Sequence, residues 1–135
     1  MKGKTAIKYI SASTAAFFAF SVAAPAQAPG LAVLDGLQKG EWSLRERGAP
    51  NGGEKICLGD PLKLTQIQHG SASCSRYIIE NTPKSLRISY KCGNLGHGVT
   101  TIRRESSGLV QIQSQGIASN APFSFTVEAR RTGSC

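Results

Sequence analysis

The chain has 135 residues, with 16 basic and 8 acidic side chains and a net charge of +8. This length suits one domain with a modest core and excludes a multidomain protein. The arginines are spread along the chain, and adjacent arginines on a strand point to opposite faces. They therefore do not form the basic stripe with stacked aromatics that a nucleic-acid interface needs, and we expect no nucleic-acid partner.

The N-terminal segment predicts export. Basic residues at Lys2, Lys4 and Lys8 precede an apolar run over residues 10–24, which is too short to span a bilayer. This pattern is typical of a secretory signal peptide, so we expect a periplasmic protein without a transmembrane helix after cleavage.

Cleavage is expected after residue 26, because the alternative after residue 28 would leave Pro29 at the new N-terminus. The predicted organisation is a signal peptide over 1–26, a lead-in over 27–39 and a disulfide-stabilised β domain over 40–135.

The domain is expected to open with a β-hairpin. Trp42 and Leu44 alternate with polar residues in a first strand over 40–48, which indicates one buried face. The sequence Ala-Pro-Asn-Gly-Gly over 49–53 is a concentrated turn signal. Residues 54–58 should therefore return antiparallel to the first strand.

A short helix should follow, from Asp60-Pro61 to about Gln68. The aspartate can cap free amides, and proline is tolerated at the first helical position. Gly70 is placed to end this helix. Its apolar residues should pack on the sheet: Leu62, Leu64 and Ile67.

Residues 74–92 read as a second hairpin. Apolar and polar residues alternate over 86–91, residues 75–80 form the partner strand, and the turn lies at 81–84. Folding about Pro83 sets Cys74 opposite Cys92.

Three strands complete the chain. We expect them over 99–105, 109–115 and 123–130, after a glycine-rich loop over 93–98, with residues 116–121 forming the last connection. With about seven strands and connections too short for helical crossovers, the fold class is mainly β: a single antiparallel meander with one short helix. The sheet could be curved, form a half-barrel or close into a small barrel.

The cysteines are expected to form two disulfide bonds, because the chain is exported. Three connectivities are possible for four cysteines. The hairpin register selects Cys74 with Cys92 and leaves Cys57 for Cys135. The second bond should hold the last strand, which would otherwise fray from a sheet edge.

The chain resembles an exported bacterial family grouped as domain of unknown function 3617. The likeness covers most of residues 36–135. It rests on the signal peptide, the Gly-x-Trp-x-Leu pattern at 40–44, the segment 55–58, the paired hairpin cysteines, and 100–104 before 109–125. The resemblance implies a periplasmic, β-rich domain and no reaction.

Catalytic and metal motifs are missing from the sequence. The two histidines, His69 and His97, each precede a glycine in a loop, and CxxC, HExxH, GxSxG and P-loop spacings do not occur. We therefore expect a non-enzymatic protein without a metal or cofactor, and a hydrolase is the less favoured alternative.

Aromatic residues could line an apolar pocket inside a curved sheet, although an ordinary core is the simpler interpretation. The candidates for lining are Trp42, Tyr90, Phe123 and Phe125, with Arg76 and Glu80 as an exposed rim on the same hairpin face. We therefore expect a binding or interaction module, with carriage of a small apolar molecule ahead of a protein-interaction or envelope structural role.

Overall fold

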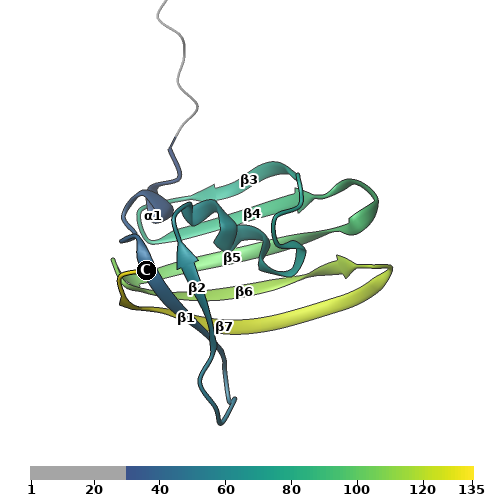
Figure 1. Ribbon diagram of the computed structural model, residues 1–135. Coiled ribbons are helices and arrows are strands. Elements are labelled where there is room, and N and C mark those ends of the chain that lie inside the picture. Colours follow the sequence, from purple (N-terminus) through teal and green to yellow (C-terminus); the bar gives the residue numbers. More distant parts are fainter. Residues whose placement is uncertain (1–29) are drawn as a thin grey trace, which may run out of the picture.

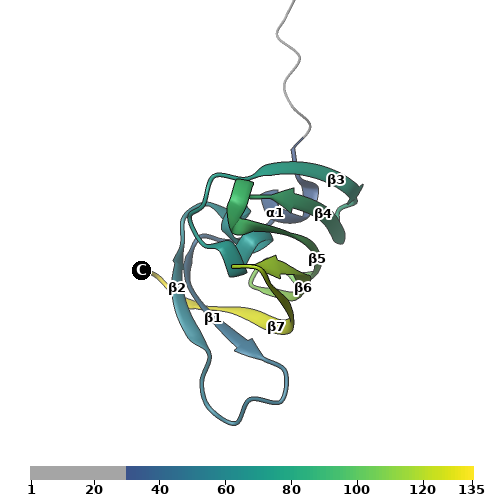
Figure 2. The same ribbon diagram turned by 90° about the vertical axis from the view of Figure 1, so that its right-hand side faces the viewer.

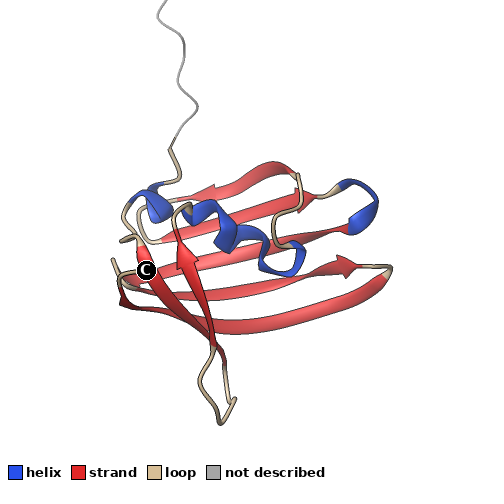
Figure 3. Cartoon of the chain, in the orientation of Figure 1, coloured by secondary structure: helices blue, strands red, loops and turns tan. Residues whose placement is uncertain are grey.

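The computed structural model describes residues 30–135, so the predicted signal peptide and its cleavage positions lie outside the described residues. Seven strands form one antiparallel sheet in the order β2-β1-β7-β6-β5-β4-β3 (Figures 1 and 3). The strands are β1 (Gly40–Glu46), β2 (Glu54–Leu58), β3 (Ser75–Asn81), β4 (Ser85–Lys91), β5 (Gly96–Ser106), β6 (Leu109–Ala118) and β7 (Ala121–Gly133). The helical segments are α1 (Ala32–Asp35), η1 (Pro61–His69) and η2 (Gly93–Leu95). The predicted antiparallel, mainly β fold with a short helix is confirmed.

The strand order departs from a simple meander at one place. Strands β3 to β7 each pair with the next, but β1 pairs with both β2 and β7. Strands β2 and β3 are consecutive in the chain, yet they form opposite edges of the sheet, and η1 runs between them (Figure 1). The sheet is therefore open and does not close into a barrel.

Segments α1 and η1 cover one face of this sheet, which we call the inner face (Figure 2). At the start of η1, the carboxylate of Asp60 accepts a hydrogen bond from the Leu62 amide at 2.9 Å. Gly70 ends η1 with a φ of 54°. These predicted start and stop signals are confirmed. The segment is a 3₁₀ helix with a kink at Gln66.

The core lies between the inner face and the helical segments. Its central members are fully or almost fully buried: Val33, Leu34, Trp42, Leu58, Leu64, Leu86, Ile88, Ile102, Val110, Ile112 and Ala129. Val33 and Leu34 belong to α1, which the sequence did not predict because four residues show no helical periodicity. The domain therefore begins before Gly40, and the lead-in assigned to 27–39 contributes to the core.

The predicted register of the second hairpin is confirmed over its first half, where Arg76 pairs with Tyr90 and Ile78 with Ile88. A β-bulge at Ile79 then shifts the register, so that Glu80 pairs with Arg87. An extra residue reverses the alternation of faces. Glu80 therefore points to the outer face, and the prediction that it shares a face with Arg76 is wrong.

The final hairpin is tighter than expected. Strand β6 continues to Ala118 and β7 starts at Ala121, so only Ser119 and Asn120 form the turn, with φ of 50° and 63°. Positive φ at both central residues fits the twist of a two-residue hairpin. The sequence did not predict this turn, because neither of its two central residues is the glycine that such turns usually contain.

Both predicted disulfide bonds are confirmed, with Cα–Cα distances of 5.7 Å for Cys57–Cys135 and 4.1 Å for Cys74–Cys92. The prediction that the last strand lies at an edge of the sheet is wrong, because β7 lies between β1 and β6. The Cys57–Cys135 bond instead joins the edge strand β2 to the end of β7. It therefore secures β2.

We predict that replacing Cys57 and Cys135 together by serine lowers the free energy of unfolding by about 4.5 kcal/mol, against about 3 for the Cys74/Cys92 pair, because the longer loop loses more entropy when closed. Urea unfolding of both double variants measures this difference. Hydrogen exchange should accelerate in β2, while β7 stays protected by its two neighbours. Faster exchange in β7 than in β2 would contradict the assignment.

Candidate functional site

The four aromatic residues predicted to line a pocket do not converge on one cavity. Trp42 is fully buried, and its indole nitrogen donates to the Gln38 carbonyl at 3.0 Å. Tyr90 is only 3% exposed. These two side chains therefore form part of the core and leave no space for a ligand beside them. Phe123 and Phe125 are half-buried, and their ring centroids lie 6.0 Å apart.

A hollow of about 480 Å³ lies at the β1–β7 end of the inner face. We call it the β1–β7 cleft. Its apolar lining includes Leu44 from β1, Ile67 from η1, and Phe125 and Val127 from β7. Its polar lining comes from the end of β1, the loop after it, the start of β2 and the end of η1: Arg45, Glu46, Asn51, Glu54 and Gln68.

At the border of the cleft, the backbone of the loop between β1 and β2 lies close to the backbone of β1. A Cβ atom added at Gly53 would lie 1.9 Å from the Leu44 carbonyl oxygen, so only glycine fits there. Gly52 and Gly53 both line the cleft. The glycine signal in the sequence thus predicted a turn, but it did not show that the turn borders a hollow.

Phe125 is the one predicted lining residue that borders this cleft. Phe123 instead borders a separate, shallower hollow of about 360 Å³ together with His97 and Gly116. Sequence reasoning placed Leu44 on the apolar face of its strand and Ile67 on the apolar side of the helix. It could not bring them together with β7, because β1 and β7 are far apart in the chain.

His69 lies at the end of η1 and contacts the aromatic residues beneath it. Its Nδ1 lies 3.1 Å from the Tyr90 hydroxyl, and its ring packs edge-on against Tyr90 and Phe123. Burial raises the pKa of Tyr90, and a hydrogen bond with Ser114 partly offsets this effect. Ser114 in turn is 2.8 Å from the Thr100 hydroxyl in the core.

The two histidines lie on different elements. His97 is exposed on β5, whereas His69, at the end of η1, is half-buried. Residues 30–135 contain no cluster of three or more histidine, cysteine, aspartate or glutamate side chains that could hold a metal ion.

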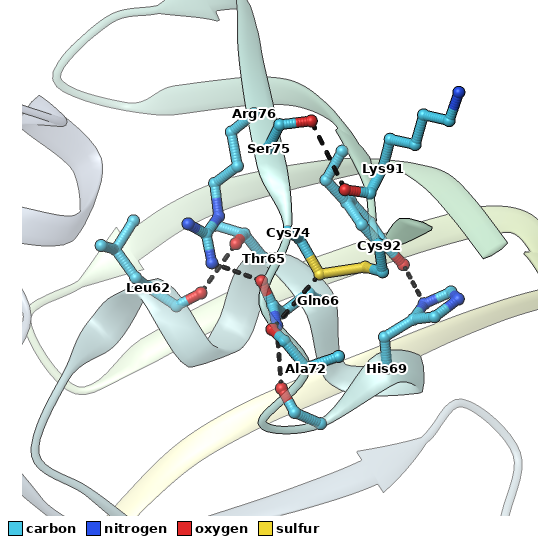
Figure 4. Close-up of a disulfide and its surroundings, with 12 residues drawn as sticks. Leu62, Thr65, Gln66, His69, Ala72, Cys74, Ser75, Arg76, Lys91 and Cys92 are labelled. Atoms are coloured by element: carbon cyan, nitrogen blue, oxygen red, sulfur yellow. Dashed lines mark hydrogen bonds between the residues drawn. A yellow bond between two sulfur atoms is a disulfide. The ribbon is translucent and has the colours of Figure 1, made fainter. Parts of the chain in front are cut away.

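Gln66 anchors the chain just before the second hairpin (Figure 4). Its Nε2 donates to the carbonyls of Gly70 at 2.9 Å and Ala72 at 2.8 Å, and its Oε1 accepts a hydrogen bond from the Arg76 guanidinium. Gln66 is almost fully buried, so these partners satisfy a polar side chain that would be costly if left alone. The kink in η1 turns the side chain toward them.

Arg76 and Glu80 do not form the predicted rim. Both are exposed as expected, but they belong to β3, at the opposite edge of the sheet from the β1–β7 cleft. The bulge also separates them onto two faces. Arg76 acts instead as a partner for Gln66.

Charged residues on the outer face near the cleft are paired with one another. The pKa of Glu128 is lowered, chiefly by a hydrogen bond from Gln111 and further by Arg130 and Arg45. These two arginines lie 3.2 and 3.9 Å from the Glu128 carboxylate. One carboxylate therefore offsets part of the positive charge of two arginines on the outer side of β1 and β7.

Comparisons with protein-family models, curated proteins and solved structures find no match to this chain. None of the helices between residues 30 and 135 has the length and apolar character needed to span a bilayer.

We predict that Tyr90→Phe lowers the free energy of unfolding by about 1 kcal/mol at neutral pH, because it removes the hydroxyl that meets His69. The raised pKa of Tyr90 means that the folded state favours the neutral phenol. Its contribution is therefore complete below pH 10.0, the ordinary value of the group, and falls as the pH rises through the folded-state pKa.

Urea unfolding at a series of pH values between neutral and strongly alkaline checks this prediction. Tyr77→Phe is the matched control, because Tyr77 is 72% exposed. The control should retain the alkaline loss of stability, and Tyr90→Phe should show a smaller one. An identical alkaline loss in both variants would show that Tyr90 does not cause it.

Proposed function

We propose that this chain is an exported, non-enzymatic binding module that carries a small, largely apolar molecule in the β1–β7 cleft. The observation that carries the proposal is the cleft itself, whose volume of about 480 Å³ lies within the range of about 300 to 1,000 Å³ typical of small-molecule sites.

The lining suits a molecule with an apolar body and a small polar group. Phe125, Val127 and Ile67 offer an apolar floor, and Gln68 and Glu46 are exposed at the border of the cleft. Burial of apolar ligand surface supplies the affinity, at about 25 cal/mol per Å² of area removed from water. The polar groups would fix its orientation.

We propose that the protein carries out this function in the periplasm. Two disulfides fit an oxidising, extracytoplasmic compartment. The signal-like N-terminal sequence supports export, and the resemblance to domain of unknown function 3617 agrees with an exported β-rich protein.

A substitution that fills the cleft with a larger side chain tests the proposal. Gln68 is exposed and borders the cleft, so Gln68→Trp should occupy the hollow without disturbing the core. We expect Nile red to bind the purified protein with increased fluorescence, and Gln68→Trp to weaken its affinity by about tenfold, which equals about 1.4 kcal/mol. Fluorescence titration measures both affinities.

Gln113→Trp is the control, because Gln113 is exposed on β6 and borders a different hollow, on the outer face. It should bind Nile red as the unchanged protein does. Native mass spectrometry of protein purified from its own periplasm should in addition show a copurified apolar compound that Gln68→Trp lacks. Equal Nile red binding by the two tryptophan variants, with no copurified compound, would refute the proposal.

A further inference from the structure

The edge strand β3 exposes an apolar surface. All seven residues of β3 are exposed, and three large hydrophobic side chains follow one another: Tyr77 at 72%, Ile78 at 38% and Ile79 at 50% exposure. An edge strand also presents unpaired backbone N–H and C=O groups along its free side. These two properties together describe a surface suited to pairing with another strand.

The other edge of the sheet differs. Strand β2 has five residues, and Lys55 on it forms an ion pair with Glu41 at 3.0 Å. Leu58 is buried, and Cys57 is tied to Cys135. Short length, charge and a covalent tie are ways in which edges are protected from pairing. Strand β3 also carries charged residues, Arg76 and Glu80, and a bulge at Ile79, but it is longer than β2 and exposes large hydrophobic side chains along its length.

The hairpin of β3 and β4 carries excess positive charge. Its basic residues are Arg76, Lys84, Arg87 and Lys91, and its single acidic residue is Glu80. Within residues 30–135, the basic partners of the ion pairs are Arg45, Lys55, Arg103 and Arg130, and none belongs to this hairpin. Arg76 is hydrogen-bonded to Gln66, and the charges of Lys84, Arg87 and Lys91 are available to an external partner.

We propose that the β3 edge binds an extended, acidic segment of another protein as an added strand. The segment would pair along Ser75 to Ile78, before the bulge interrupts the regular register. The side chains of the added strand on the outer face would then lie beside Tyr77. Two strand spacings of about 4.8 Å each would separate this added strand from β4. Lys91 and Arg87 on the outer face of β4 are long enough to meet acidic side chains across this distance.

Two other occupants fit the surface less well. An anionic bilayer would match the apolar and basic residues, but it would leave the free backbone groups of β3 without hydrogen-bond partners, at a cost of several kcal/mol each. A second copy of the chain would set two positively charged hairpins against each other, and like charges across an interface are unfavourable. An acidic strand satisfies both the backbone and the charges.

A defined peptide tests the proposal. The probe is a fluorescein-labelled peptide, Glu-Val-Glu-Val-Glu-Val-Glu, whose binding to the full mature chain is followed by fluorescence anisotropy. We expect saturable binding that weakens as salt screens the charges. The same peptide N-methylated at every backbone amide cannot donate backbone hydrogen bonds, and it should not bind. The corresponding Lys-Val peptide should not bind either.

Two variants with the same change in net charge locate the site. Arg87→Glu with Lys91→Glu should weaken binding by about tenfold or more. Lys55→Glu with Arg130→Glu alters ion-paired residues of β2 and β7, on the other side of the sheet, and should leave the affinity within about twofold of the original, the range expected for distant charges in salt. The Gln68→Trp variant should bind the peptide as the unchanged protein does. Failure of the proposed strand binding can therefore be distinguished from failure of the proposed ligand binding in the β1–β7 cleft.

Three outcomes would overturn the proposal: no binding of the acidic peptide, equal binding of its N-methylated form, or equal loss of affinity in the two charge variants. Cosedimentation with phosphatidylglycerol vesicles in the absence of peptide binding would assign the surface to a bilayer instead. Concentration-dependent dimers in analytical ultracentrifugation that exclude the peptide would assign it to a second copy.

Discussion

Burial of the inner face of a single sheet beneath η1 and α1 is the interaction on which the rest of the structure depends. A sheet with one apolar face needs a second layer, and this chain supplies that layer with two short helical segments. Leu64 from η1 and Val33 from α1 are fully buried. Without them, the strand residues Leu86, Ile102 and Ile112 would face water.

The path of η1 also explains why the sheet stays open. This segment crosses the inner face from β2 at one edge to β3 at the other, so the two edges are held apart by the layer that covers the core. The two disulfides then secure the ends of that crossing. Cys57 lies before η1 and Cys74 after it, and Gln66 ties the kink of η1 to the backbone that leads into the second hairpin.

The two surfaces proposed for binding arise from what this small second layer leaves uncovered. At the β7 side, the cover ends near Ile67, and Phe125 and Val127 border a hollow. At the β3 side, the edge strand projects beyond the cover, with Tyr77, Ile78 and Ile79 exposed. The two surfaces lie at opposite sides of the sheet, so a small ligand and a protein segment need not compete.

The local elements could be predicted from the sequence: the alternating faces of β1 and β4, the Asp60 cap, the first register of the second hairpin and, through that register, both disulfides. Each depends on residues close in the chain, where period-two patterns and turn chemistry act directly. Only the tertiary structure decided that β1 pairs with β7, that α1 joins the core, that Ile79 forms a bulge and that the cleft combines β1, β7 and η1. Long-range pairing depends on how whole faces fit together, and a one-residue bulge or a four-residue helix leaves no periodic signal. For the same reason, alternation correctly identified Trp42 and Tyr90 as inward-facing residues, but it could not distinguish a filled core from the lining of a cavity.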